Sequence, residues 1–79
     1  MQETFQVAFG RRVQKIRKQR GWSQEKLAEK TGLTRETISR IETGKYGTHF
    51  YHVDIIRAAF NISFEEFFAT FTKEEEEES

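Results

Sequence analysis

Five polar side chains lie close together on both sides of one apolar residue, Ile38, in a chain of 79 residues. They are Arg35, Glu36, Thr37, Ser39 and Arg40. Arginine can donate two parallel hydrogen bonds to guanine, glutamate can accept from the cytosine amino group, and threonine can contact a thymine methyl group. If one helix presents these side chains together, they could bind the edges of DNA bases.

Apolar spacing predicts the helix that such a set requires. Ile38 and Ile41 mark one face of a helix from Arg35 to about Thr43, which turns the polar side chains the other way. Arg35 and Glu36 would lie in the first turn and reach deepest into a groove. We expect base contacts from Arg35, Glu36 and Thr37, and base or phosphate contacts from Ser39 and Arg40.

The same helix-boundary signal occurs twice, at Gly21-Trp22-Ser23 and at Gly32-Leu33-Thr34. Glycine readily takes the left-handed conformation that ends a helix, and Ser or Thr can cap the next helix. These signals predict one helix from Gln24 to about Lys30 and another from Arg35, joined by a tight turn. Such a pair forms a helix-turn-helix, whose second helix enters the major groove of DNA.

Three further helices are predicted, which makes the expected fold all-α with five helices. A first helix should end near Arg20, and Gly10 within it favours irregular first turns, because glycine costs about 1 kcal/mol relative to Ala. The capping sequence from Ser63 to Glu66 opens the fifth helix. The apolar positions are Phe5, Phe9, Val13 and Ile16 in the first helix, Phe50, Val53, Ile56 and Phe60 in the fourth, and Phe64, Phe67, Phe68 and Phe71 in the fifth.

Composition limits the class of protein. With 35% hydrophobic and 33% charged residues, the chain is expected to be one small domain over residues 1–73, followed by an acidic, disordered tail over 74–79. We expect a cytoplasmic protein, since no apolar run could span a bilayer and the N-terminus does not resemble a signal peptide. The absence of cysteine excludes disulfides and thiolate metal sites.

Charge is unevenly distributed along the chain, although the formal net charge is zero. Residues 1–40 carry a net +6, with 10 Lys and Arg against 4 Glu, and residues 41–79 carry a net −6. The basic half suits a polyanionic partner such as double-stranded DNA. The run from Glu74 to Glu78 is expected either to be a solvated tail or to compete with DNA for the basic face.

Residues Val13 to Gly44 resemble the lambda-repressor and Cro-like helix-turn-helix family, also called the XRE family. The resemblance is carried by Ile16-Arg17, Trp22 to Ala28, Thr31-Gly32-Leu33 and Ile38 to Lys45. It implies a five-helix lambda-repressor-like domain, with the helix-turn-helix at helices 2 and 3, that binds operator DNA as a twofold dimer. The loop from Tyr46 to His49 departs from the family because it lacks the usual proline.

Three residues are expected to contact DNA phosphates. Gln24 opens the second helix, where its amide can donate to a phosphate beside the free N–H groups and the positive end of the helix dipole. The family resemblance implies the same backbone contact at this position. Arg17 and Lys45 flank the surface and should bind phosphates through their charge.

A stripe of four aromatic rings on the fifth helix predicts a homodimer interface. Phe64, Phe67, Phe68 and Phe71 are more than one thin helix can bury in a domain of this size. One recognition helix also reads too few base pairs for useful discrimination, so a symmetric dimer on inverted half-sites is expected. The spacing does not decide which rings belong to the core and which to the interface.

Metal-binding and enzymatic interpretations are weak. His49 and His52 are spaced by three residues but have no third ligand. Ser39, His52 and Asp54 lack the strand-to-helix turn and oxyanion loop that a catalytic triad needs. We therefore expect no cofactor, no metal and no catalytic activity.

The sequence thus predicts a sequence-specific, autoregulatory transcriptional regulator, similar to phage repressors and to the controller proteins of restriction–modification systems. An alternative is an antitoxin-like protein-interaction module that also binds DNA. Its protein partner would order the C-terminal helix and tail, from Phe67 to Ser79. The operator sequence and the choice between activation and repression stay open at this level.

Overall fold

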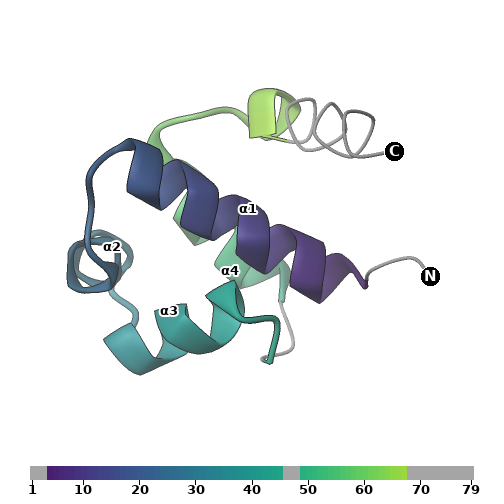
Figure 1. The fold of residues 1–79 in the computed structure, drawn as a ribbon. Helices are drawn as coiled ribbons and strands as arrows, with labels where there is room; N and C mark the ends of the chain where they lie inside the picture. Colours follow the sequence, from purple (N-terminus) through teal and green to yellow (C-terminus); the bar gives the residue numbers. More distant parts are fainter. Residues whose placement is uncertain (1–3, 46–48, 68–79) are drawn as a thin grey trace.

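The computed structural model describes residues 4–45 and 49–67 of the chain. They form α1 (Phe5–Gln19), α2 (Gln24–Thr31), α3 (Arg35–Glu42) and α4 (Phe50–Phe60), and a fifth helix begins at Phe64. In Figure 1, α1 runs across the middle of the molecule, with α3 on one side of it and the start of the fifth helix on the other. Over these described residues, the predicted all-α, five-helix fold is confirmed.

Short-range capping explains why the helices begin and end where the sequence predicted. Ser23 Oγ accepts from the backbone N–H of Lys26 at 3.0 Å, and Thr34 Oγ1 accepts from that of Thr37 at 3.1 Å. Gly32 ends α2 in the left-handed conformation, at φ 76°. The two boundaries predicted for the helix-turn-helix are therefore confirmed.

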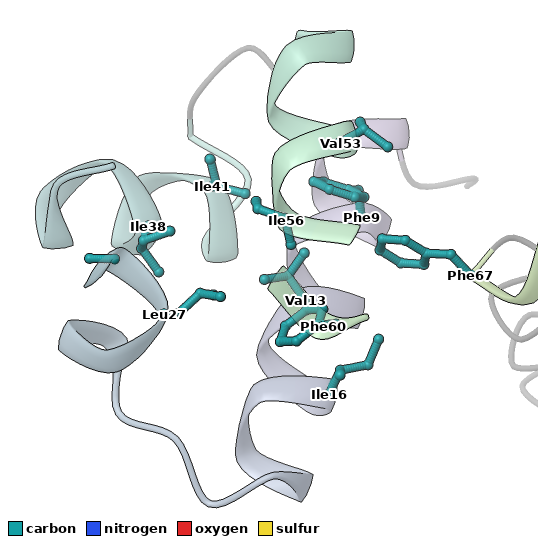
Figure 2. Packing of buried hydrophobic residues seen from close by; sticks show 11 residues of the cluster. Phe9, Val13, Ile16, Leu27, Ile38, Ile41, Val53, Ile56, Phe60 and Phe67 are labelled. Carbon is teal, nitrogen blue, oxygen red and sulfur yellow. The ribbon is translucent and has the colours of Figure 1, made fainter. Parts of the chain in front are cut away.

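The hydrophobic core draws side chains from all the described helices. Ile38 and Ile41 of α3 and Ile56 of α4 are fully buried, and they lie between the helices as Figure 2 shows. The apolar positions predicted to face inward are buried in α1 through α4, apart from Phe5 and Phe50, which are exposed. The core therefore holds the inner face of the predicted recognition helix against the rest of the domain.

Gly10 corrects the expectation that α1 begins irregularly. The helix is regular from Phe5, and Gly10 is buried within it. A Cβ atom at this position would lie 2.1 Å from the carbonyl oxygen of Ile41 and 2.9 Å from that of Glu42. Glycine is therefore needed because α1 and the end of α3 approach each other closely here.

Phe67 corrects the prediction of the dimer interface. Its side chain is 1% exposed, and its ring centroid lies 5.6 Å from that of Phe9. Figure 2 shows the ring directed towards Phe9 from the side opposite α3. The first turn of the fifth helix turns this residue inward, so Phe67 belongs to the core rather than to a surface between two copies.

Within residues 4–45 and 49–67, no helix has both the length and the apolar character that crossing a membrane would require.

Candidate nucleic-acid interface

The turn between α2 and α3 is held by both packing and hydrogen bonds. Leu27 and Ile38 are fully buried where the two helices cross. Thr31 Oγ1 donates to the carbonyl oxygen of Leu27 at 2.9 Å and accepts from the backbone N–H of Leu33 at 3.2 Å. A threonine at the end of α2 therefore satisfies backbone groups on both sides of the turn, which fixes the direction of α3.

The outer face of α3 carries the five side chains that the sequence singled out. Arg35, Glu36 and Arg40 are exposed, and Thr37 and Ser39 are half-buried. Ile38 and Ile41 occupy the opposite, buried face. The structure therefore brings the predicted base-contacting set together on one helix, and their contact with bases stays a prediction.

Two exposed ion pairs lie on this surface. Arg35 Nε donates to Glu25 Oε1 of α2 at 2.8 Å, and both side chains are 63% exposed. Arg40 Nη2 donates to Glu36 Oε1 of the same helix at 2.6 Å. Both arginines of α3 are therefore paired with a carboxylate in the absence of DNA.

Arg17 corrects another expectation, because it is a buried residue rather than a surface cation. Its guanidinium donates to both oxygens of Glu42, from Nε to Oε2 at 2.6 Å and from Nη2 to Oε1 at 3.1 Å. Its Nη1 donates to the carbonyl oxygen of Trp22 at 2.8 Å. Through these three hydrogen bonds, the buried Arg17 side chain links α1 to α3 and to the segment that precedes α2.

Gln24 and Lys45 lie at the edges of the same surface. Gln24 is the first residue of α2 and is half-buried, and its Nε2 donates to Glu42 Oε1 at 3.1 Å. Its amide therefore joins the buried pair, and a single Nε2 hydrogen is left to reach a phosphate. Lys45 is exposed just beyond α3, where its backbone N–H donates to the carbonyl oxygen of Arg40 at 3.0 Å.

Comparison with known proteins identifies the family. The sequence profile described as helix-turn-helix matches residues 13–67 of the chain. The chain belongs to this family. It is of the lambda-repressor and Cro-like, or XRE, type that the sequence resembled.

Two curated relatives of this helix-turn-helix protein are named as transcriptional regulators. The chain is 36% identical over 70 residues to the HTH-type transcriptional regulator PuuR of Escherichia coli (strain K12). The match covers 89% of this chain and 38% of PuuR. The chain therefore spans well under half the length of PuuR. It is 39% identical over 57 residues to the uncharacterized HTH-type transcriptional regulator YgzD of Bacillus subtilis (strain 168), with 72% and 86% coverage.

Solved structures similar to this helix-turn-helix protein include restriction–modification controller proteins. The controller protein C.Esp1396I, solved as a tetramer in complex with its natural 35 base-pair operator, has 32% identity and a TM-score of 0.84, and the match covers 91% of this chain and 96% of that one. C.AhdI from Aeromonas hydrophila has 31% identity and a TM-score of 0.72, with 77% and 92% coverage.

Sequence reasoning missed the structural roles of Glu25 and Glu42 in this domain. Glu42 follows Ile38 by four residues, and Arg17 follows Val13 by four, so helical spacing already placed both charges on buried faces. Opposite charges on two inward faces are a signal for a buried ion pair. Glu25 gave no such signal, because both it and its partner Arg35 lie on exposed faces of their helices.

An aromatic surface lies at the beginning of α4. Phe50 is 74% exposed and Tyr51 is 59% exposed. The ring of Phe50 stacks on that of Phe64 at 5.6 Å, and the guanidinium of Arg57 lies 4.6 Å from the Phe64 ring centroid. Phe68 and Phe71, the other rings predicted at a dimer interface, lie outside the described residues.

His52 is buried at the first turn of α4, where its Nδ1 accepts from the backbone N–H of His49 at 3.4 Å. Burial lowers the pKa of His52, and the neighbouring His49 lowers it further. In the part of the chain that the structure describes, no three His, Asp or Glu side chains cluster as metal ligands. The bond to His49 makes His52 part of the capping box that begins α4.

Proposed function

We propose that this protein is a transcriptional regulator that binds a specific double-stranded DNA sequence by placing α3 in the major groove. One observation carries the proposal: α3 exposes Arg35, Glu36 and Arg40 from a helix-turn-helix whose inner face is fully buried. The similarity to C.Esp1396I, a controller protein solved on its operator, supports the same use of the fold.

Each residue of the surface has an expected role. Arg35, Glu36 and Thr37 contact base edges from the first turn of α3, while Ser39 and Arg40 contact either bases or phosphates. Gln24 and Lys45 contact the phosphate backbone on either side. Arg17 is left out of this set because its side chain is buried and makes three hydrogen bonds within the domain.

The regulator is proposed to bind as a homodimer to inverted half-sites and to regulate its own synthesis. A single α3 presents about five polar side chains, too few to select one site in a genome, whereas two copies double the length of sequence that is read. The exposed aromatic side chains Phe50 and Tyr51 provide a surface on which a second copy can pack. The tetrameric assembly of C.Esp1396I on its operator supports an oligomeric regulator.

The antitoxin-like alternative depends on residues Phe67 to Ser79, of which 68–79 lie outside the described residues. No contact within residues 4–45 and 49–67 favours it.

Selection of duplexes from a random pool by the purified chain, followed by affinity measurements at several salt concentrations, tests the proposal. With roughly 6–10 phosphate contacts per dimer, log affinity should fall against log salt with a slope of about −5 to −9. Arg35→Ala should reduce affinity for the selected sequence by roughly 1–3 kcal/mol and leave binding to random duplexes nearly unchanged.

Lys45→Ala is the matched control, because Lys45 is expected to contact phosphate alone. It should weaken binding to every duplex by a similar factor and make the salt slope shallower by about one per protomer. A selected pool without a common sequence, together with a salt slope near zero, would show that the domain does not regulate transcription through DNA.

A further inference from the structure

The bond between Arg35 and Glu25 uses one particular nitrogen of the guanidinium. Arg35 donates from Nε to Glu25 Oε1 at 2.8 Å. The two terminal nitrogens, Nη1 and Nη2, have no hydrogen-bond partner among the described residues. Glu25 therefore holds the side of the guanidinium and leaves the edge formed by the two terminal nitrogens unoccupied.

That unoccupied edge is able to bind guanine. A forked arginine contact directs two parallel N–H groups at guanine O6 and N7, and the pair Nη1 and Nη2 supplies them. A long, flexible side chain loses conformational freedom when it makes such a contact, and the cost falls if the side chain is already held in place. We propose that Glu25 is a positioning residue that orients Arg35 for a guanine and so helps to set sequence specificity from outside α3.

This inference rests on the proposed function, in which Arg35 contacts a base. The role of Glu25 goes beyond the proposed function because it assigns part of the sequence specificity to α2, the helix expected to contact only the DNA backbone. Both side chains of the pair are 63% exposed, so solvent screens their attraction and the pair contributes little to folding. Changing Glu25 should therefore alter recognition while the domain stays folded.

The second ion pair of the surface has the opposite geometry. Arg40 donates to Glu36 from Nη2, at 2.6 Å, so a terminal nitrogen of that guanidinium is already occupied. One of the two N–H groups of Arg40 Nη2 is used by Glu36, so this pair takes a donor from a terminal nitrogen. Glu25, in contrast, takes no donor from the two terminal nitrogens of Arg35.

A second glutamate of α2 supplies a matched control within the chain. Glu29 carries the same charge as Glu25 one helical turn later, is also exposed, and has no proposed contact with DNA. Replacing either with methionine removes one charge and one hydrogen-bond acceptor at similar length. The loss of charge alone should strengthen binding to all duplexes in both variants, because each glutamate repels the phosphates.

The test compares the unmodified chain with Glu25→Met, Glu29→Met, Arg35→Ala and the double variant Glu25→Met/Arg35→Ala. Affinity is measured for the selected duplex and for copies in which 7-deazaguanine replaces one guanine at a time, which removes the N7 acceptor. In the Arg35→Ala variant, affinity should no longer depend on the N7 atom of the guanine that Arg35 contacts. The position where this dependence is lost identifies that guanine. Circular dichroism confirms that each variant is folded.

Glu25→Met should reduce discrimination at that one guanine by about 3- to 10-fold, which lies within the coupling measured between contacting residues. Glu29→Met should leave the discrimination there unchanged. In the Arg35→Ala background, Glu25→Met should have no further effect on discrimination, since the arginine that it positions is gone.

Two results would overturn the inference and leave the proposed function standing. In the first, Glu25→Met leaves discrimination at the guanine unchanged although Arg35→Ala abolishes it. In the second, Glu25→Met still changes discrimination at that guanine in the Arg35→Ala background. If the unmodified chain showed no preference for any selected duplex, the proposed function itself would fail, and the role of Glu25 with it.

Discussion

Arg17 on α1 and Glu42 at the end of α3 form a buried, two-pronged ion pair between residues 25 positions apart. Their side chains are only 9% and 0% exposed. Gln24, the first residue of α2, donates to the same carboxylate, and the guanidinium also donates to the carbonyl oxygen of Trp22. One charged cluster thus joins α1 to both helices of the helix-turn-helix and helps to fix the orientation in which α3 meets DNA.

Removing one partner of this pair should destabilise the domain strongly. Arg17→Met or Glu42→Met would leave an uncompensated buried charge, and either should lower the free energy of unfolding by about 3–5 kcal/mol. The double variant should lose much less than the sum of the two single losses, because two apolar side chains can pack together in the space. Urea unfolding followed by circular dichroism measures all three. A loss below about 1 kcal/mol in both single variants would contradict the interpretation.

Gly10→Ala should also be destabilising, although alanine has the higher helix propensity by about 1 kcal/mol. The added Cβ atom would lie 2.1 Å from the carbonyl oxygen of Ile41, and only a shift of α1 against α3 can relieve that contact. We expect the free energy of unfolding to fall by about 1–3 kcal/mol or more, as in other overpacked cores.

Gly21→Ala is the control for Gly10→Ala, and both are compared by urea unfolding. Gly21 has φ 71° and no atom within 4 Å of its added Cβ, so its substitution costs only the left-handed backbone strain of roughly 1–2 kcal/mol. If Gly10→Ala were as stable as the unmodified chain, the close approach of the two helices would not constrain this position.

Features that depend on neighbouring residues could be predicted from the sequence. The caps at Ser23 and Thr34 act over three residues, so their positions indicated where both helices of the helix-turn-helix begin before any tertiary contact was known. The outer face of α3 followed in the same way from the helical spacing of Ile38 and Ile41, since burial of one face leaves the opposite face exposed.

Features that depend on distant residues could not be predicted in this way. The spacing of Arg17 from Val13 placed it on an inward face, but its pairing with Glu42 belongs to the packing of two helices, and Arg17 was interpreted as a surface cation. Gly10 was interpreted through helix propensity because the approach of Ile41 belongs to the packing of two helices. The aromatic stripe of the fifth helix likewise did not show that Phe67 packs inward on Phe9, because four rings at helical spacing span more than one face.

The stability of the domain should depend on the protonation of His52. Burial and the neighbouring His49 lower the pKa of His52 below its ordinary value of 6.5, so the folded chain favours the neutral ring. The unfolded chain binds a proton as the pH falls through about 6.5, and the folded chain binds it only at lower pH. Stability should therefore decrease from about pH 7.5 downwards and level off below the folded-state pKa.

Urea unfolding midpoints between pH 8 and pH 5 test this dependence. His52→Asn keeps a polar side chain but does not titrate, so its midpoint should change less across the same range. The matched variant His49→Asn, at the exposed cap position, should retain most of the dependence on pH. A midpoint of the unmodified chain that rises as the pH falls through 6.5 would contradict the assignment to His52.

Polar substitutions in the aromatic surface at the start of α4 should weaken self-association of the chain. Phe50 stacks on Phe64, yet 74% of Phe50 remains exposed, and Tyr51 beside it is 59% exposed. Burying a phenylalanine side chain contributes roughly 1.5–3 kcal/mol, and a twofold interface uses each residue twice. Phe50→Ser should therefore raise the dimer dissociation constant by at least about tenfold, and Tyr51→Ser should act in the same direction.

Sedimentation equilibrium across the micromolar range measures the dissociation constant, and binding to a duplex with one or two half-sites measures its consequence on DNA. Val7→Ser is the control, because Val7 is an exposed apolar side chain (38%) on α1, a different helix from that of Phe50 and Tyr51. It should leave the dissociation constant unchanged. Phe50→Ser should bind a single half-site almost normally and lose the added affinity of the second, because its α3 surface is intact. If the unmodified chain sedimented as a monomer and bound both duplexes equally well, this surface would not hold a dimer.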